Sequence, residues 1–208
     1  MQTYYQAYTS SGLDADGIAN DVAYSGGGYA LSAAGPGDGL AHGITILGNA
    51  VTNHSDKTFT VTGTDANDAA LSEGIAGPNG NVTVTSTRFF KTVTSVTVSA
   101  TTGADTFDIG WNASSMGAAI YPDFSRNPVI NTMIFCRVPS GTPTYGVQFT
   151  ADLTPAGTDD TTSWLAHATI AAKSATFSGQ IAFPVTALRL AFTATGPVNM
   201  TVIVPYKG

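Results

Sequence analysis

The chain has 208 residues and a formal net charge of −6, and only 11% of its residues are charged. Soluble domains typically have about a quarter of their residues charged. Helix formers such as glutamate and lysine are scarce here, which argues against long exposed helices. The eight basic residues are scattered, so the clustered positive face that nucleic-acid binding requires is not expected. We therefore predict an all-β protein that does not bind nucleic acid.

Further features of the sequence bear on where the chain folds. No apolar run is long enough for a transmembrane helix, so no membrane association is expected. The first residues lack the positive segment and apolar core of a secretory signal. Cys136 is the only cysteine, which excludes an intramolecular disulfide, and its apolar neighbours indicate a buried, inert thiol. We expect the chain to be made and folded in a cytoplasm.

Residues 1–42 are unlike the start of an ordinary domain. MQTYYQAYTS predicts one aromatic strand, whereas SGGGYALSAAGPGDG is too rich in glycine and small residues to pack alone. Two interpretations compete, a flexible linker and an extended arm laid across a neighbouring subunit. Aromatic side chains among the glycines favour the arm, because a linker gains nothing from them. The candidate partner-binding residues are Tyr4, Tyr5, Tyr8, Tyr24, Tyr29 and Leu31.

From residue 43 the strand signal is continuous. In KTFTVTG, Phe59 and Val61 alternate with threonines, so one face of this strand is apolar and the other carries hydroxyl groups. The predicted strands cover residues 43–51, 57–64, 70–78, 81–90, 94–100 and 106–111. Short strands separated by turn residues such as GPNG fit a small immunoglobulin-like β-sandwich over residues 43–112, with Trp111 in the core or at an interface.

A second series of strands follows a connecting segment. Residues 112–128 contain Pro122 and Pro128, which oppose regular pairing and indicate a link between domains. The predicted strands beyond it cover residues 129–138, 144–153, 173–183, 186–195 and 198–205, with a further short run over residues 164–170, for which a helical turn over residues 163–167 is the alternative. The fold class that we predict is therefore two small β-sandwich domains in tandem, over residues 43–112 and 113–208, with an extended N-terminal arm over residues 1–42.

Residues 183–205 nearly repeat residues 90–111. The first copy reads FKTVTSVTVSATTGADTFDIGW and the second reads FPVTALRLAFTATGPVNMTVIVP. The apolar positions that correspond are Val93 and Val185, Val96 and Leu188, Phe107 and Met200, and Ile109 and Val202. Each copy has two alternating runs around a glycine-containing turn, which is the pattern of a β-hairpin. The repeat predicts that both domains close with the same hairpin.

Groups that could carry chemistry are few. Residues 14–17 begin like a calcium loop, but the glycine comes two residues early and the final glutamate is missing, so a turn capped by aspartates is the better interpretation. The three histidines have no neighbours at zinc-ligand spacing, and no Gly-x-Ser-x-Gly elbow is present. The adjacent carboxylates Asp159 and Asp160 lie in a polar loop. We expect no enzymatic activity, no cofactor and no metal.

Two blocks of the sequence resemble proteins of a known kind. Residues 54–111, with KTFTVTGTD, the GPNG turn and FKTVTSVTVS, resemble a module that recurs in structural proteins of tailed bacteriophages. Residues 145–205, with YGVQFTADL and FPVTALRLAFTATGPVNMTVIV, are similar to a companion segment in such proteins. Together the blocks cover well over half of the chain. The resemblance implies a non-enzymatic structural protein of the virion, made in the host bacterial cytoplasm.

The resemblance leaves the place in the particle open. A capsid decoration (cement) protein, which stabilises the head lattice through subunit–subunit contacts, is favoured by the small size and the arm-like N-terminal segment. The alternative is a tail, neck or fibre-associated protein, including a receptor- or carbohydrate-binding module that uses Tyr4, Tyr5, Tyr24 and Tyr29. The expected partners are the major capsid protein, other virion proteins and further copies of the chain, and a trimer would match threefold lattice positions.

Overall fold

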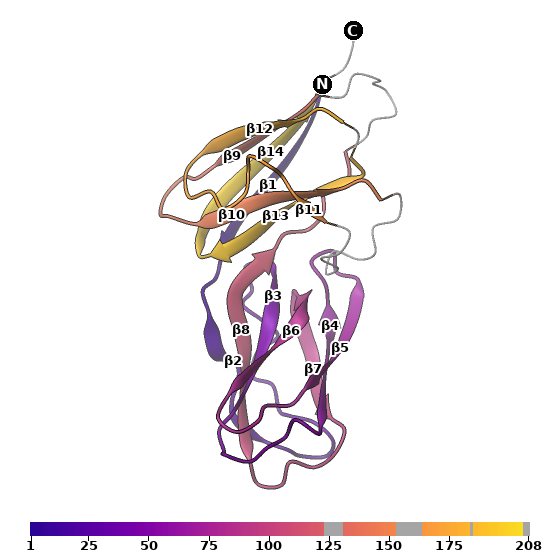
Figure 1. Cartoon of the computed structure of the whole chain (residues 1–208), viewed down its shortest axis with the longest axis vertical. Helices are drawn as coiled ribbons and strands as arrows, with labels where there is room; N and C mark the ends of the chain where they lie inside the picture. The colour runs from indigo at the N-terminus through magenta and orange to yellow at the C-terminus, as the bar shows by residue number, and fades with distance from the viewer. Residues whose placement is uncertain (123–130, 153–163, 184, 206–208) are drawn as a thin grey trace.

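The computed structural model describes residues 1–122, 131–152, 164–183 and 185–205. Within these residues the chain forms strands and no helix, which confirms the all-β prediction. The strands make a four-stranded sheet A, a seven-stranded sheet B and a three-stranded sheet C. Figure 1 shows an elongated molecule with sheet A in its upper half, sheet C in its lower half and sheet B running through both.

The lower half is a sandwich of sheet C against four strands of sheet B. Sheet C has the order β5 (Ala70–Ala76), β4 (Thr58–Thr64), β7 (Thr92–Val98). The strands of sheet B here are β2 (Asp14–Ala23), β8 (Thr106–Met116), β3 (Ala41–Gly48) and β6 (Thr83–Phe90). Alternation along these strands turns one set of side chains inward, and Ile46, Phe59 and Phe107 are completely buried. They form the first hydrophobic core.

The upper half is built in the same way around a second core. Sheet A has the order β1 (Gln2–Ser10), β14 (Gly196–Val204), β9 (Thr132–Arg137), β12 (Phe177–Ile181). Sheet B contributes β13 (Ala187–Ala194), β10 (Thr144–Thr150) and the short β11 (Leu165–Ala166). Leu190, Met200 and Val202 are completely buried between the sheets. Every stretch that the sequence predicts to be a strand overlaps an observed one, whereas β2 was not predicted.

The two halves share sheet B. Strand β8 runs through residue 112, the expected domain boundary, and pairs with β13 through Met116 with Ala191 and Ser115 with Phe192. The same strand pairs with β2 and β3 lower down. One strand therefore carries backbone hydrogen bonds to both sandwiches, which makes the connection between them a continuous sheet.

The expected N-terminal arm over residues 1–42 is corrected by the structure. β1 pairs antiparallel with β14 along its whole length, from Gln2 with Val204 to Ser10 with Gly196. β2 pairs with β8, and residues 25–34 follow the edge of β7, where the Tyr29 amide donates to the Val96 carbonyl at 3.0 Å. A free arm would leave its backbone groups without hydrogen-bond partners in the chain and its aromatic side chains unpacked. Here both find their partners within the chain.

The predicted hairpins are also corrected. In the first copy of the repeat, β7 belongs to sheet C and β8 to sheet B, and in the second copy, β13 belongs to sheet B and β14 to sheet A. Each copy is therefore an arch that joins two facing sheets, because its strands pair with other partners. The eight apolar positions that correspond between the copies are nevertheless all buried.

The single glutamate closes one side of the lower sandwich. Glu73 on β5 accepts hydrogen bonds from the backbone amides of Thr87 and Arg88 on β6, at 2.8 and 2.9 Å, and from the Thr87 hydroxyl at 2.8 Å. These amides lie on a sheet edge, where unpaired groups invite pairing with another chain. Glu73 therefore protects this edge with a charge. Among the described residues no helix is long and apolar enough to cross a membrane.

Candidate docking face

The outer face of sheet A carries a group of exposed apolar side chains. One cross-strand row contains Tyr5, Thr201 and Phe135, and the next row contains Ile203 beside Met133. Tyr5, Met133 and Phe135 are 63%, 56% and 45% exposed. We call Tyr5, Met133, Phe135 and Ile203 the docking face. These side chains lie on the outer face of sheet A, in the upper half of the molecule (Figure 1).

The docking face is a consequence of how β9 is composed. Ile134 and Cys136 point into the second core and are buried, so Met133 and Phe135 point outward. A strand with one solvated face normally alternates apolar and polar residues, whereas continuous apolar strands are covered on both faces. The sequence MIFC is apolar at four successive positions, so β9 carries apolar side chains on its outer face as well as on its inner one.

The outer face of sheet A is almost free of charge. Its outward positions follow from the register: Thr3, Tyr5, Ala7, Thr9, Pro197, Asn199, Thr201, Ile203, Met133, Phe135, Arg137, Ser178 and Gln180. Arg137 is the one charged side chain in this set, and the set contains no carboxylate. In a chain of net charge −6, a carboxylate-free face of this size is a place where another surface can approach without repulsion by like charges.

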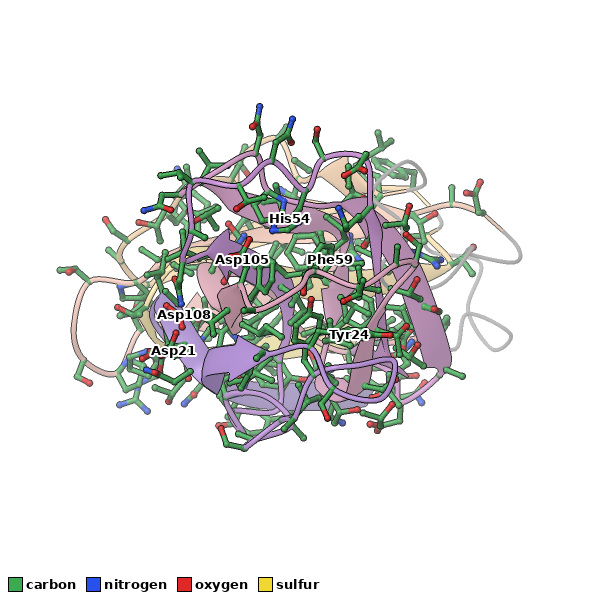
Figure 2. All side chains as sticks on the ribbon, turned by 90° about the horizontal axis from the view of Figure 1, so that it is seen from below. Asp21, Tyr24, His54, Phe59, Asp105 and Asp108 are labelled. Atoms are coloured by element: carbon green, nitrogen blue, oxygen red, sulfur yellow. The ribbon has the colours of Figure 1, made fainter. Side chains whose placement is uncertain are left out.

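The opposite end of the molecule is acidic. Figure 2, seen from below, shows Asp21 beside Asp108 and His54 beside Asp105. The Asp21 amide donates to Asp108 Oδ1 at 2.7 Å, Asn49 Nδ2 donates to the same oxygen at 3.1 Å, and the Thr106 hydroxyl donates to Asp21 Oδ1. These bonds hold Asp21 in a left-handed conformation with φ of 50°. Among the described residues no group of three or more metal-ligating side chains is found.

His54 and Asp105 form a pair at the same end. His54 Nε2 lies 2.9 Å from Asp105 Oδ2, and its ring packs against Phe107 with centroids 5.3 Å apart. Hydrogen bonds from the side chains of Thr52 and His54 hold the pKa of Asp105 below its usual value. The pair anchors the loop around residue 54 to the first core.

A second histidine–aspartate pair lies buried where the two halves meet. His42 Nδ1 is 3.0 Å from the Asn112 carbonyl oxygen and Nε2 is 2.9 Å from Asp38 Oδ2. The Asn112 carbonyl oxygen can only accept, so Nδ1 donates to it, and Nε2 faces the carboxylate of Asp38. Burial alone would raise the pKa of Asp38, but hydrogen bonds from His42 and from the amides of Leu40 and Ser11 outweigh it and lower that pKa.

The lowered pKa of Asp38 predicts a loss of stability in acid. A carboxyl whose pKa is depressed on folding stabilises the protein above its unfolded pKa, about 3.9, and loses that contribution as the pH falls through the lower folded pKa. We expect the free energy of unfolding of wild type to approach that of Asp38→Asn below about pH 4 and to exceed it by a constant amount above about pH 5. Urea unfolding across this range measures the difference; a difference that does not change with pH would contradict the assignment.

The remaining histidine and the cysteine have structural surroundings. His167 Nε2 donates to the Gln180 carbonyl at 3.2 Å, while Nδ1 accepts from the amides of Thr169 and Ile170 at 3.2 and 3.3 Å. The ring lines a groove of about 260 Å³ next to Phe149, smaller than most ligand sites. Burial raises the pKa of the Cys136 thiol to about 12, which keeps it protonated and unreactive.

A buried arginine lies on β13 in the upper half. Arg189 is completely buried, donates through Nε to Gln148 Oε1 at 2.8 Å, and places its guanidinium 4.2 Å from the centre of the Trp164 ring. Buried charges are retained where partners satisfy them, and a cation over an aromatic ring is such a partner. These contacts tie β13 to β10, which carries Gln148, and to Trp164 immediately before β11, and they are part of the upper sandwich.

The predicted partner-binding residues are not brought together. Tyr29 is buried in the first core, where its ring stacks on Phe59 with centroids 5.7 Å apart, and Tyr24 and Leu31 pack against the same core. Tyr4 and Tyr8 pack against the second core. Tyr5 is the one of the six that is mainly exposed, and it belongs to the docking face.

Comparison with known proteins gives no assignment. The chain matches no protein-family model, no curated protein and no solved structure. Its function is therefore inferred from the surface and packing described above, together with the sequence resemblance.

Three residues of the docking face were missed from the sequence. Met133, Phe135 and Ile203 lie in runs that predict strands but do not show which face of each strand is covered. A signal was present, because MIFC is apolar at four successive positions and one sandwich core can bury only alternate ones. Ile203 gives no such signal, since its outward position is set by pairing with β1 and β9.

Proposed function

We propose that this chain is a structural protein of a tailed-bacteriophage particle, a decoration protein that stabilises the head lattice through subunit–subunit contacts. The observation that carries the proposal is the docking face, an apolar group on the outer side of sheet A in which Tyr5, Met133 and Phe135 are exposed. Exposed apolar patches are characteristic of contacts with other macromolecules, whereas small ligands bind in concave sites. The resemblance of residues 54–111 and 145–205 to tailed-phage structural proteins supports the choice of particle.

The distribution of polar groups supports a non-enzymatic role. His42, His54 and His167 each bind a carboxylate or a carbonyl oxygen within the fold. Cys136 is buried and held protonated. General acid–base and nucleophilic catalysis need such groups at an accessible site, and these four are committed to packing and to anchoring loops.

We further propose that the two halves are β-sandwich units of the immunoglobulin-like kind that meet near residue 112. Two such units sharing sheet B make a stiff body that can contact neighbours at one end while the other end projects. Sheet A, with the docking face, is the contact end in this proposal, and the acidic end with Asp21 and Asp108 faces away from the head. In the particle the chain contacts the major capsid protein and other copies of itself.

Purified particles of the phage that encodes the chain provide the test. We expect the wild-type chain to co-sediment with heads, and the substitution Phe135→Asp to reduce the bound copies by more than about ten-fold, as removal of a central contact does. Val51→Asp is the control, because Val51 is 89% exposed at the acidic end and the change in charge is the same. Absence of the chain from particles, or its presence on tails alone, would contradict a decoration role.

A further inference from the structure

We infer that the docking face binds the docking face of a second copy of this chain, an assignment that rests on the proposed structural role and names the partner. An apolar group within a face of threonine, serine and amide side chains is best covered by a surface that is itself apolar and uncharged at the matching positions. The outer face of sheet A is such a surface, with Arg137 as its one charge.

Charge favours this face over the other surfaces of the chain. Two copies that each carry a net charge of −6 repel one another, so self-association is favoured where carboxylates are absent. Asp21 and Asp108 lie at the lower end of the molecule and sheet A in the upper half (Figures 1 and 2). Contact through sheet A therefore keeps the two acidic ends away from the interface, which lowers the electrostatic cost of pairing.

The register of sheet A specifies how two copies fit. A homodimer with two-fold symmetry uses the same patch on both chains. An axis that lies between the row of Phe135 and the row of Met133 sets Phe135 of each copy against Met133 of the other. Thr201 and Ile203 meet in the same way. This arrangement places apolar side chains against each other on both sides of the axis.

The same axis separates the two arginines. Arg137 is three residues along β9 from the axis, so at about 3.3 Å per residue the two copies of Arg137 are roughly 20 Å apart. That separation exceeds the Debye length of about 8 Å at physiological ionic strength, so their repulsion is screened. The long aliphatic part of each arginine can cover the rim of the apolar group.

The size of the face sets the expected strength. Four strands about 4.8 Å apart, with up to nine residues at about 3.3 Å each, give a face on the order of 500 Å² per copy. A pair then buries about 1,000 Å², at the lower limit for specific interfaces. We therefore expect a weak dimer, populated in the micromolar to millimolar range, that becomes effective where many copies are held close together on one particle.

Sedimentation velocity and light scattering on the full chain test the inference. The wild type should pass from monomer to dimer as its concentration rises, and Phe135→Asp and Met133→Lys alone should each weaken the association by more than about ten-fold. A mixture of the two variants should form a heterodimer, because the introduced carboxylate of one chain then faces the introduced ammonium group of the other. Leu165→Asp, at a residue 61% exposed on β11, is the control and should dimerise as wild type does.

The outcomes separate this inference from the proposed function. Thermal unfolding checks that each variant is folded, which is expected because both side chains point outward. A wild type that stays monomeric at millimolar concentration, a Phe135→Asp chain that still dimerises, or a mixture that does not pair would overturn the inference. If the wild type is monomeric but Phe135→Asp still loses binding to particles, the proposed function stands and the face binds a different particle protein.

Discussion

Truncation of Phe107 to alanine is expected to lower the free energy of unfolding by about 3 to 5 kcal/mol, as large aromatic truncations in cores do. The side chain is completely buried in the first core. Its ring contacts those of Phe59 and Tyr29, with centroids 5.1 and 5.5 Å apart, and that of His54 at 5.3 Å. Replacing it with alanine reduces the apolar area that is buried on folding. It also leaves a cavity between the two sheets, because their hydrogen-bonded backbones cannot move together to fill it. Urea unfolding followed by fluorescence and circular dichroism measures the loss.

Met200 is the matched position in the second copy of the repeat, and it too is completely buried. Met200→Ala should cost about 2 to 5 kcal/mol, whereas Val51→Ala, at a side chain 89% exposed, should change stability by less than about 0.5 kcal/mol. Because β8 pairs with strands of both halves, we expect one cooperative transition in calorimetry for all of these chains. A second, separate transition in Phe107→Ala would show instead that the halves unfold independently.

The repeat illustrates what the sequence can predict about this fold. Alternation of apolar and polar residues depends only on the local strand, so it correctly marked Val93, Val96, Phe107 and Ile109 as inward-facing. Which strand pairs with which depends on distant residues. A glycine turn between two alternating runs is compatible with a hairpin within one sheet and with an arch between two sheets. An arch forms because β3, β4, β9 and β10 pair with the strands of the two copies, along edges where the strands within each copy would otherwise pair with each other.

The predictions for the N-terminal segment and for the docking face were incomplete for a related reason. The strand through Tyr4, Tyr5 and Tyr8 was predicted, but its partner β14 is nearly the whole chain away in sequence. The local sequence does not distinguish a strand that pairs within its own chain from one that pairs with a neighbouring chain. Residues 25–34 have glycines that suggest freedom, yet Tyr29 anchors them in the first core. Exposure of Phe135 likewise depends on which face of sheet A the second core covers.

The substitution Gly110→Ala is expected to destabilise the protein by about 3 kcal/mol, at the upper end of the effects of overpacking. Gly110 lies on β8 where β2 crosses closest, and a Cβ there would overlap the Asp14 carbonyl oxygen and lie 2.5 Å from the Ala15 carbonyl carbon. Both obstacles are backbone atoms, so no change of rotamer relieves the clash. β2 must move away from β8, and this movement also stretches the hydrogen bond of 2.9 Å that Trp111 Nε1 donates to the Gly12 carbonyl oxygen.

Gly74→Ala is the matched control, since Gly74 is also within a strand. A Cβ at Gly74 would meet the Thr58 Cγ2 methyl group at 2.9 Å, and a turn of the Thr58 side chain about χ1 moves that group away. Hydrogen exchange should show faster opening of β2 amides in Gly110→Ala and unchanged protection in Gly74→Ala. Equal stability of the two variants would mean that β2 is loosely attached, which would restore the possibility of a mobile N-terminal segment. A large loss of stability confined to Gly110→Ala would show that residues 14–23 are firmly attached to the rest of the chain. The close approach of the β2 and β8 backbones would then contribute to the stability of sheet B, which both sandwiches share.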